Sequence, residues 1–60
     1  MDRIGINRRA ALMMFWNAGF NNEALLARAV EILNGIRPAA EGYYYADDVA
    51  AAIELEGVPA

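Results

Sequence analysis

The side chains able to move protons are carboxylates and tyrosines, because the chain contains no histidine and no cysteine. It also lacks serine, threonine, lysine and glutamine, so all five of its cations are arginines. Acyl transfer therefore has no hydroxyl or thiol nucleophile from serine, threonine or cysteine, and a Schiff base has no lysine. The remaining carboxylates and tyrosines could act as general acids or bases, but their spacing forms no recognisable catalytic arrangement. The sequence therefore predicts a protein that is not an enzyme.

The same absences limit metal and phosphate chemistry. Zinc and iron sites built from cysteine and histidine are excluded, and a Walker-type phosphate loop lacks its lysine and its serine or threonine. Asp47 and Asp48 are adjacent carboxylates, but a calcium loop needs oxygen ligands at several spaced positions. Their place before an apolar segment favours a helix cap instead. We therefore expect no cofactor, no metal and no small-molecule ligand.

The length of the chain allows one small domain, which we assign to residues 1–60. A core of this size rarely supplies more than about 3–5 kcal/mol of net stability, and without cysteine no disulfide supports it. A second copy or a partner protein is therefore more probable than in a larger domain. The lack of cysteine gives no sign of an oxidising compartment, and we expect a cytoplasmic protein.

Charge is unevenly distributed along this chain, whose net charge is −3. The first twenty residues are cationic through Arg3, Arg8 and Arg9, whereas residues 41–60 contain only acidic charges. The chain as a whole would be repelled by a phosphate backbone, which makes nucleic acid an unfavourable partner. The two oppositely charged ends would suit contact with each other, within one chain or between two, or they are simply solvated.

The run RRAALMMFW places two arginines before seven apolar residues. A secretory signal needs a longer apolar region and a cleavage site, and a membrane span needs about 20 apolar residues. The run therefore predicts a helix that is apolar on nearly every side, part of which two neighbouring helices would leave exposed. The large side chains concerned are Met13, Met14, Phe15 and Trp16. For Phe15 and Trp16 taken singly, core packing is the slightly favoured interpretation.

The expected fold is an all-α domain of three helices. They span about residues 7–18, 22–35 and 47–56. The middle helix is the clearest, since its apolar residues fall within one broad arc of the helical wheel. They are Leu25, Leu26, Ala29, Val30, Ile32, Leu33 and Ile36. Asn21 or Asn22 is expected to cap this helix, and Gly35 to end it in the left-handed conformation.

The outer two helices have their own signals. Asn7 is the expected N-cap of the first helix, and Val49, Ala52 and Ile53 form the apolar side of the third. Between the second and third helices, RPAAEGYYYA predicts a turn and an extended tyrosine-rich loop, for which no partner strand is evident.

Alternation in that loop would point Tyr43 and Tyr45 to one side and Tyr44 to the other. We interpret Tyr43 and Tyr45 as a lid over the end of the helical core. Tyr44 is left open between the core and a contact surface.

Two segments resemble known families. AGFNNEALLARAV followed by DVAAAIEL resembles the ubiquitin-associated three-helix domain, which implies a protein-binding surface around residues 18–20. The matching residues are Gly19, Phe20, Asp48, Val49, Ala52, Ile53 and Glu54. The departures are Ala18 in place of the family's methionine and the long connection before the third helix. YYYADDVAAAIELEGV resembles the opening helix of a MerR- or excisionase-type helix-turn-helix, whose DNA-reading helix would follow Ala60.

These observations predict a small interaction module that self-associates or docks on a larger protein through its apolar helix. Small acidic proteins of this kind often act as adaptors or inhibitors, including phage accessory proteins. The expected partner-binding residues are Arg8, Arg9, Met13, Met14, Phe15, Trp16, Phe20 and Tyr44. The alternative is a DNA-associated regulator of helix-turn-helix type that uses Arg3, Arg8 and Arg9. An enzyme dependent on carboxylates or tyrosines is the third possibility.

Overall fold

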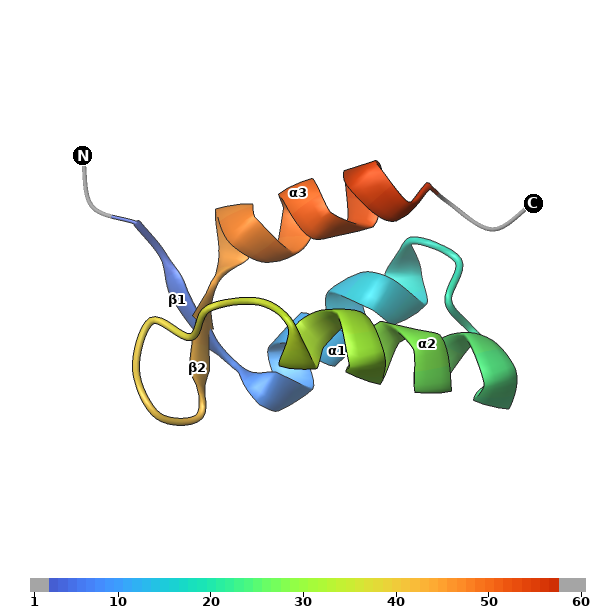
Figure 1. The fold of residues 1–60 in the computed structure, drawn as a ribbon, viewed down its shortest axis with the longest axis horizontal. Helices are drawn as coiled ribbons and strands as arrows, with labels where there is room; N and C mark the ends of the chain where they lie inside the picture. The colour runs from blue at the N-terminus through green and yellow to red at the C-terminus, as the bar shows by residue number, and fades with distance from the viewer. Residues whose placement is uncertain (1–2, 58–60) are drawn as a thin grey trace.

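The computed structural model describes residues 3–57 as three helices and a short antiparallel sheet (Figure 1). The elements in chain order are β1 (Gly5–Asn7), α1 (Arg8–Asn17), α2 (Glu23–Asn34), β2 (Tyr43–Tyr45) and α3 (Ala46–Glu56). The three predicted helices are confirmed, with bounds that shift by at most one residue. The fold is mostly helical, but the prediction of a purely all-α domain is wrong because of the sheet.

The sheet joins the segment before α1 to the segment before α3. β1 pairs antiparallel with β2, and the opposed residues are Gly5 and Tyr45, Ile6 and Tyr44, and Asn7 and Tyr43. The tyrosine-rich segment was expected to be a loop without a partner strand, and this expectation is wrong. Its partner, Gly-Ile-Asn, is too short to show alternation of polar and apolar residues, which is the sequence signal of a strand.

Two asparagines cap the first two helices, as the sequence predicts. The side-chain oxygen of Asn7 accepts a hydrogen bond from the N–H of Ala10 at 2.8 Å, and that of Asn22 accepts one from Leu25 at 2.9 Å. Each cap satisfies one of the four N–H groups that a helix leaves free at its start. The cap at Asn7 also sets the point at which β1 ends and α1 begins.

Two other predicted helix ends are wrong. Gly35 follows α2 with φ of −86°, in the right-handed region and not the left-handed one. Asp47 and Asp48 do not cap α3, because the N-cap is Tyr45, which makes no side-chain capping bond. The two carboxylates lie instead in the first turn of α3, where negative charge interacts favourably with the helix dipole.

The core lies where the inner sides of the three helices meet β2. Its buried residues are Ala11, Phe15, Phe20, Ala29, Leu33, Tyr44, Val49 and Ile53. The rings of Phe15 and Phe20 meet edge to face, with their centroids 5.3 Å apart. Gly19, at φ of +120°, lets the chain turn back after α1, and the N–H of Phe20 then donates to the carbonyl of Phe15 at 3.0 Å.

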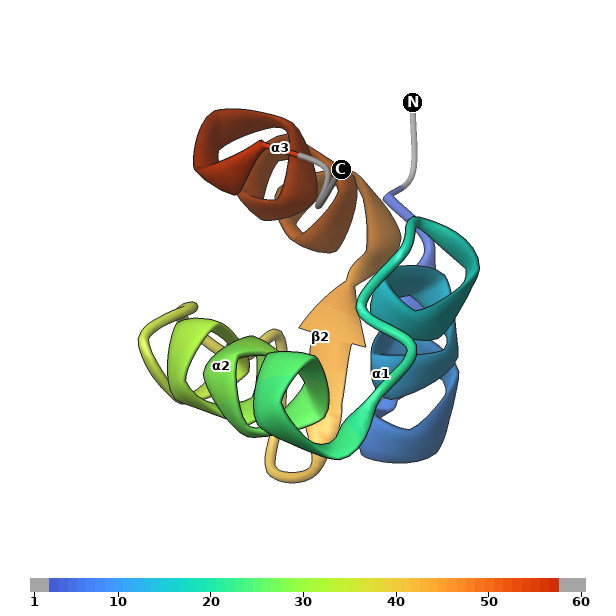
Figure 2. The same ribbon diagram turned by 90° about the vertical axis from the view of Figure 1, so that its right-hand side faces the viewer.

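The arrangement of the helices leaves one side of α1 uncovered. In the view along the helices, α2 and α3 both lie to the same side of α1 (Figure 2). α1 packs against each of them, and Arg28 of α2 reaches across to Glu56 of α3, with nitrogen–oxygen distances of 3.0 and 3.2 Å. Arg28 also lies 3.6 Å from Glu31, one turn further along α2. Within residues 3–57, no helix has the length and apolar character needed to cross a bilayer.

Candidate protein-binding surface

The residues of α1 divide into an inner and an outer side. Ala11 and Phe15, one turn apart, are completely buried. With 3.6 residues per turn, the direction opposite their midpoint is that of Met13. Arg9 and Trp16 lie within about one sixth of a turn of Met13. The outward side of α1 therefore carries Arg9, Met13, Trp16 and the exposed Asn17 at its end, and we call Arg9, Met13 and Trp16 the α1 stripe.

The α1 stripe is exposed although most of it is apolar. Met13 is 51% exposed and Trp16 is 44% exposed, which confirms the expectation that part of this run is uncovered. Arg9 is also exposed, and within residues 3–57 it has no ion pair or hydrogen-bond partner. A cation at one end and two large apolar side chains beyond it thus face solvent together.

Several residues expected at the surface lie elsewhere. Phe15 and Phe20 are buried in the core, and Met14 is half-buried against it. Core packing was favoured for Phe15 and Trp16 taken singly, which is confirmed for Phe15 and wrong for Trp16. Arg8 is directed inward, since its guanidinium donates to the Asn34 side chain at 3.1 Å and to the Tyr44 hydroxyl at 3.2 Å. These side chains position the α1 stripe and do not belong to it.

Tyr43 and Tyr45 were interpreted as a lid over the core and Tyr44 was left open, but the buried position belongs to Tyr44. Tyr44 is the buried one, whereas Tyr43 is exposed and Tyr45 half-buried. The alternation of the strand is as predicted, but Tyr44, and not Tyr43 and Tyr45, faces the helices. Because its hydroxyl accepts a hydrogen bond from Arg8, the ring packs in the core without an unsatisfied polar group.

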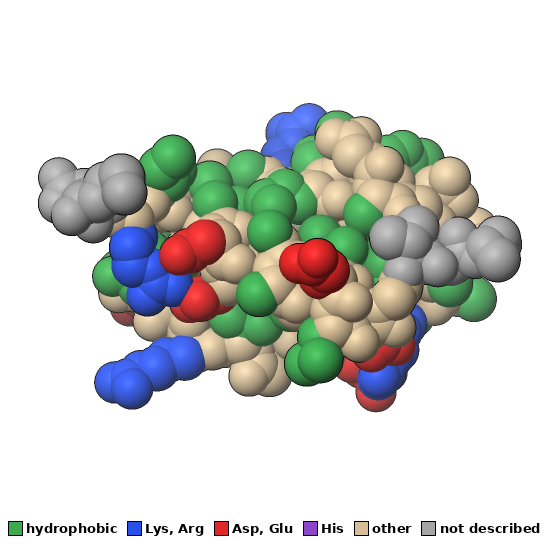
Figure 3. All heavy atoms as spheres, turned by 90° about the horizontal axis from the view of Figure 1, so that it is seen from above, with side chains coloured by type: hydrophobic (Ala, Val, Ile, Leu, Met, Phe, Trp, Pro, Cys, Tyr) green, Lys and Arg blue, Asp and Glu red, His purple; other side chains and the backbone are tan. Residues whose placement is uncertain are grey.

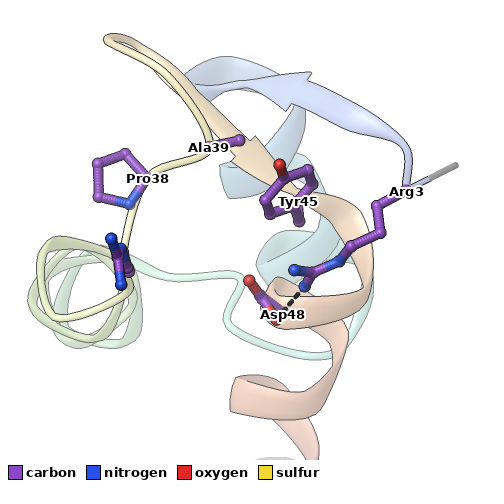
Figure 4. Close-up of a pocket in the computed structure, with 6 residues that line it drawn as sticks. Arg3, Pro38, Ala39, Tyr45 and Asp48 are labelled. Carbon is purple, nitrogen blue, oxygen red and sulfur yellow. Dashed lines mark hydrogen bonds and ion pairs between the residues drawn. The ribbon is translucent and has the colours of Figure 1, made fainter.

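A pocket of about 360 Å³ lies between the turn that follows α2 and the junction of β2 with α3 (Figure 4). Its lining residues are Arg3, Arg37, Pro38, Ala39, Tyr45 and Asp48. The guanidinium of Arg3 lies over the ring of Tyr45, 3.9 Å from the ring centroid. Its Nη2 is 3.0 Å from a carboxylate oxygen of Asp47 and also bonds Asp48.

The charged groups around this pocket largely compensate one another. Hydrogen bonds from Arg3 lower the pKa of the Asp47 carboxyl and raise the pKa of Arg3, as expected for a paired cation and anion. Among the described residues, no buried side-chain polar atom lacks a hydrogen-bond partner. We therefore regard the Arg3 contacts as a clip that holds the segment before β1 against α3.

Residues 3–57 contain no cluster of three or more acidic, cysteine or histidine side chains that could hold a metal ion. Viewed from above, the face over α3 carries carboxylates scattered among apolar side chains, with basic and acidic groups adjoining at the left and at the lower right (Figure 3).

Two exposed apolar residues were missed by the sequence analysis. Leu55 on α3 is 91% exposed and Ile4, before β1, is 70% exposed. For Leu55 a signal exists, because it stands between Glu54 and Glu56 on the polar side of the third helix. For Ile4 the signal is weaker: it is an apolar residue beside Arg3, in a segment without the helical period that would indicate a buried face.

Comparisons of this chain with protein-family models, with curated proteins and with solved structures found no match. The resemblances to the ubiquitin-associated domain and to the helix-turn-helix segment therefore stay predictions. Function has to be argued from the geometry of the surface.

Proposed function

We propose that this protein is a non-enzymatic interaction module that binds another protein through the α1 stripe. The observation that carries the proposal is the exposure of Met13 and Trp16 on adjacent turns of one helix. Their backbone is held in place from behind by Ala11 and Phe15, which are fully buried. A rigid helix that presents large apolar side chains offers contact area at little cost in conformational entropy.

The side chains of the α1 stripe define the chemistry of the partner. Trp16 is of the residue type most enriched at binding hot spots, and Met13 adapts its shape to an irregular surface. Arg9 adds a cation whose charge is not compensated within the described part of the chain. The matching surface is an apolar recess large enough for an indole ring, with a carboxylate at one side.

A small module of this kind suits the role of an adaptor or inhibitor. It presents one preformed helix face to the partner. The rest of the domain would then cover the surface of the partner next to the recess. Binding itself, without a chemical step, would then change the activity or the assembly of the larger protein.

The alternative of DNA binding through the N-terminal arginines receives less support. Two of these side chains are engaged within the chain, Arg3 with two carboxylates and Arg8 with Asn34 and Tyr44. Arg3 also lies beside the acidic start of α3, which would repel phosphate groups. Protein binding through the α1 stripe uses side chains that are already exposed, so no contact within the chain has to break.

The proposal is tested by capture of proteins from a lysate of the native host on the immobilised chain. We expect Trp16→Ala and Met13→Glu to lose the captured protein. Leu55→Glu is the control, since it changes an apolar residue on α3 that is even more exposed than Met13 and Trp16, and it should retain that protein. Thermal unfolding of each variant separates loss of binding from loss of fold.

Trp16 is also the only tryptophan of the chain, so its fluorescence reports directly on the α1 stripe. Addition of the captured protein should shift the emission of Trp16 to shorter wavelength as the indole leaves water. Capture that survives Trp16→Ala and Met13→Glu but fails with Leu55→Glu would place the binding surface on α3 and contradict the proposal.

A further inference from the structure

β1 has a backbone edge that is unpaired within residues 3–57, where the sheet contains two strands. The carbonyl of Ile4 accepts a hydrogen bond from the N–H of Ala46 at 2.9 Å, and Ile6 lies opposite Tyr44. In an antiparallel ladder alternate residues direct their polar groups to opposite edges. The N–H and C=O of Gly5 and the N–H of Asn7 therefore point away from β2, toward solvent.

This edge lacks most of the features that usually protect an exposed strand. Proteins discourage strand addition with proline, with charged side chains or with a bulge, and β1 contains none of these. The neighbouring charge of Arg3 is already shared with Asp47 and Asp48. Gly5 leaves the polar groups at the centre of the edge uncovered, and Ile4 beside it is 70% exposed.

No intramolecular reason accounts for glycine at position 5. Its φ does not lie in the positive range that would exclude other residues. A Cβ atom added there would meet no atom within 4 Å. Glycine in a strand often marks a place where another backbone approaches closely.

We propose that β1 pairs antiparallel with β1 of a second copy of this chain, about a two-fold axis at Gly5. The two Gly5 residues exchange both of their backbone hydrogen bonds in this register. The N–H of Asn7 donates to the Arg3 carbonyl of the second copy. The product is one four-stranded sheet in the order β2-β1-β1-β2, shared between two chains.

The second copy is favoured over another peptide because the edge is complementary to itself. Ile4 and Ile6 lie on the same face of the strand, and Ile6 packs against the core. Pairing about Gly5 places the exposed Ile4 of each copy opposite Ile6 of the other. These are non-hydrogen-bonded pairs, in which cross-strand side chains approach most closely.

The charges on either side of the edge are complementary in the same register. Asn7 leads into Arg8 and Arg9, so the cationic start of α1 in one copy comes to the end of the sheet where the other copy carries Asp47. Both Arg9 and Asp47 are exposed, and within residues 3–57 Arg9 has no partner of its own. Their approach reduces the repulsion between two chains of net charge −3.

Assembly through this edge ends at two copies. The other edge of β2 is covered at Tyr43 by its own chain, because the N–H of Tyr43 donates to the Ala40 carbonyl at 2.9 Å and its carbonyl accepts from the N–H of Ala39 at 3.0 Å. β1 is thus the open edge of the described sheet, and a two-fold pairing uses it up. The interface is short, so we expect a weak dimer that forms at high concentration.

The test is sedimentation equilibrium of the intact chain from low micromolar to millimolar concentration. Gly5→Pro removes the N–H that faces the open edge and leaves the groups that bond β2, a place where sheets tolerate proline. We expect it to raise the dimer dissociation constant about tenfold or more, because both symmetry-related hydrogen bonds are lost. Gly5→Ala is the comparison variant: it keeps the N–H but adds a Cβ atom where the two backbones approach, so it should raise the dissociation constant less than Gly5→Pro does.

A second variant and a second measurement cover the case in which Gly5→Pro fails to fold. Ile4→Glu changes a side chain that is mostly exposed, so it should keep the fold and lose the dimer. In the parent chain, hydrogen exchange at the amides of Gly5 and Asn7 should slow as concentration rises, while Trp16 emission stays constant. The latter separates this dimer from binding through the α1 stripe.

The proposal is overturned by a parent chain that stays monomeric up to millimolar concentration. It is equally overturned by a dimer that persists in Ile4→Glu, or by one that is lost in Trp16→Ala and accompanied by a shift in Trp16 emission. The last result would assign self-association to the α1 stripe and not to β1.

Discussion

The two sides of α1 are built from the same kinds of residue but do different work. On the inner side Ala11 and Phe15 are completely buried, whereas on the outer side Met13 and Trp16 remain about half exposed. All four lie within one ten-residue helix. The apolar character of a side chain therefore did not decide whether it is buried or exposed. Burial was decided by the position of α2 and α3, which both lie on one side of α1.

We propose that the inner side of α1 serves stability and that the outer side serves binding. A side chain in full contact with α2, α3 and β2 loses all of those contacts when it is truncated. A side chain that is half in water loses much less. The predictions that follow change one side of α1, then both sides, then neither.

The largest effect is expected from Phe15→Ala on the inner side. Truncation removes a buried ring and its edge-to-face contact with Phe20, at a cost of about 3–5 kcal/mol. A loss of this size equals the whole net stability expected of so small a core. The variant should therefore be largely unfolded at room temperature, as measured by far-ultraviolet circular dichroism and thermal unfolding.

Trp16→Ala is the matched change on the outer side. It should remain folded, with a thermal midpoint close to that of the parent chain. If the two variants were destabilised to the same extent, the division of α1 into a structural side and a binding side would fail.

An intermediate effect is expected from Asn7→Ala, which loosens the start of α1 and therefore touches both sides together. Loss of the bond between the Asn7 side chain and the N–H of Ala10 should lower the free energy of unfolding by about 1 kcal/mol. Asn17→Ala, at the other end of α1, removes no capping bond and serves as the control. Equal urea midpoints for the two variants would show that the observed cap contributes nothing.

The smallest effect is expected from acid, which acts away from both sides of α1. Contact with Arg3 lowers the pKa of Asp47 below the value of about 3.9 for an unfolded aspartate. The contribution of this pair to stability is therefore complete above about pH 5 and is lost as the pH falls through the lowered pKa. Because both side chains are exposed, the loss should be slight.

Urea unfolding at pH 6 and at about pH 3 measures this effect. Asp47→Asn should show a smaller decrease in stability between the two pH values than the parent chain, with Trp16 emission in the folded state unchanged in both. An identical pH dependence in the two proteins would mean that the Arg3–Asp47 contact does not contribute in solution.

Local signals predicted much of the helical framework. Asn7 and Asn22 cap helices where the sequence placed them, because a capping bond spans three residues and depends on little else. The inner face of the third helix, with Val49 and Ile53 buried, likewise follows from the helical period. Gly35 shows the limit of such signals, since its conformation depended on how the next segment folds back and was predicted incorrectly.

The candidate binding residues were predicted only in part. The sequence indicated that some of the apolar run would be exposed, and Met13 and Trp16 are. It could not separate them from Phe15, since consecutive apolar residues give no amphipathic contrast around the helix. Tyr44 was misjudged for a related reason, because the side of the tyrosine segment that faces the core depends on β1.

By itself the sequence determined three helices, their order, the absence of most catalytic and metal-binding side chains, and an apolar first helix too large for its neighbours to cover. These follow from residue types and from patterns that repeat within a few residues. Only the tertiary structure decided that β1 pairs with β2, that Arg3 engages Asp47 and Asp48, and that Met13 and Trp16 face outward. Each of these is a relation between segments far apart in the chain. It depends on which surfaces are removed from water when the helices pack together, and no local pattern records this.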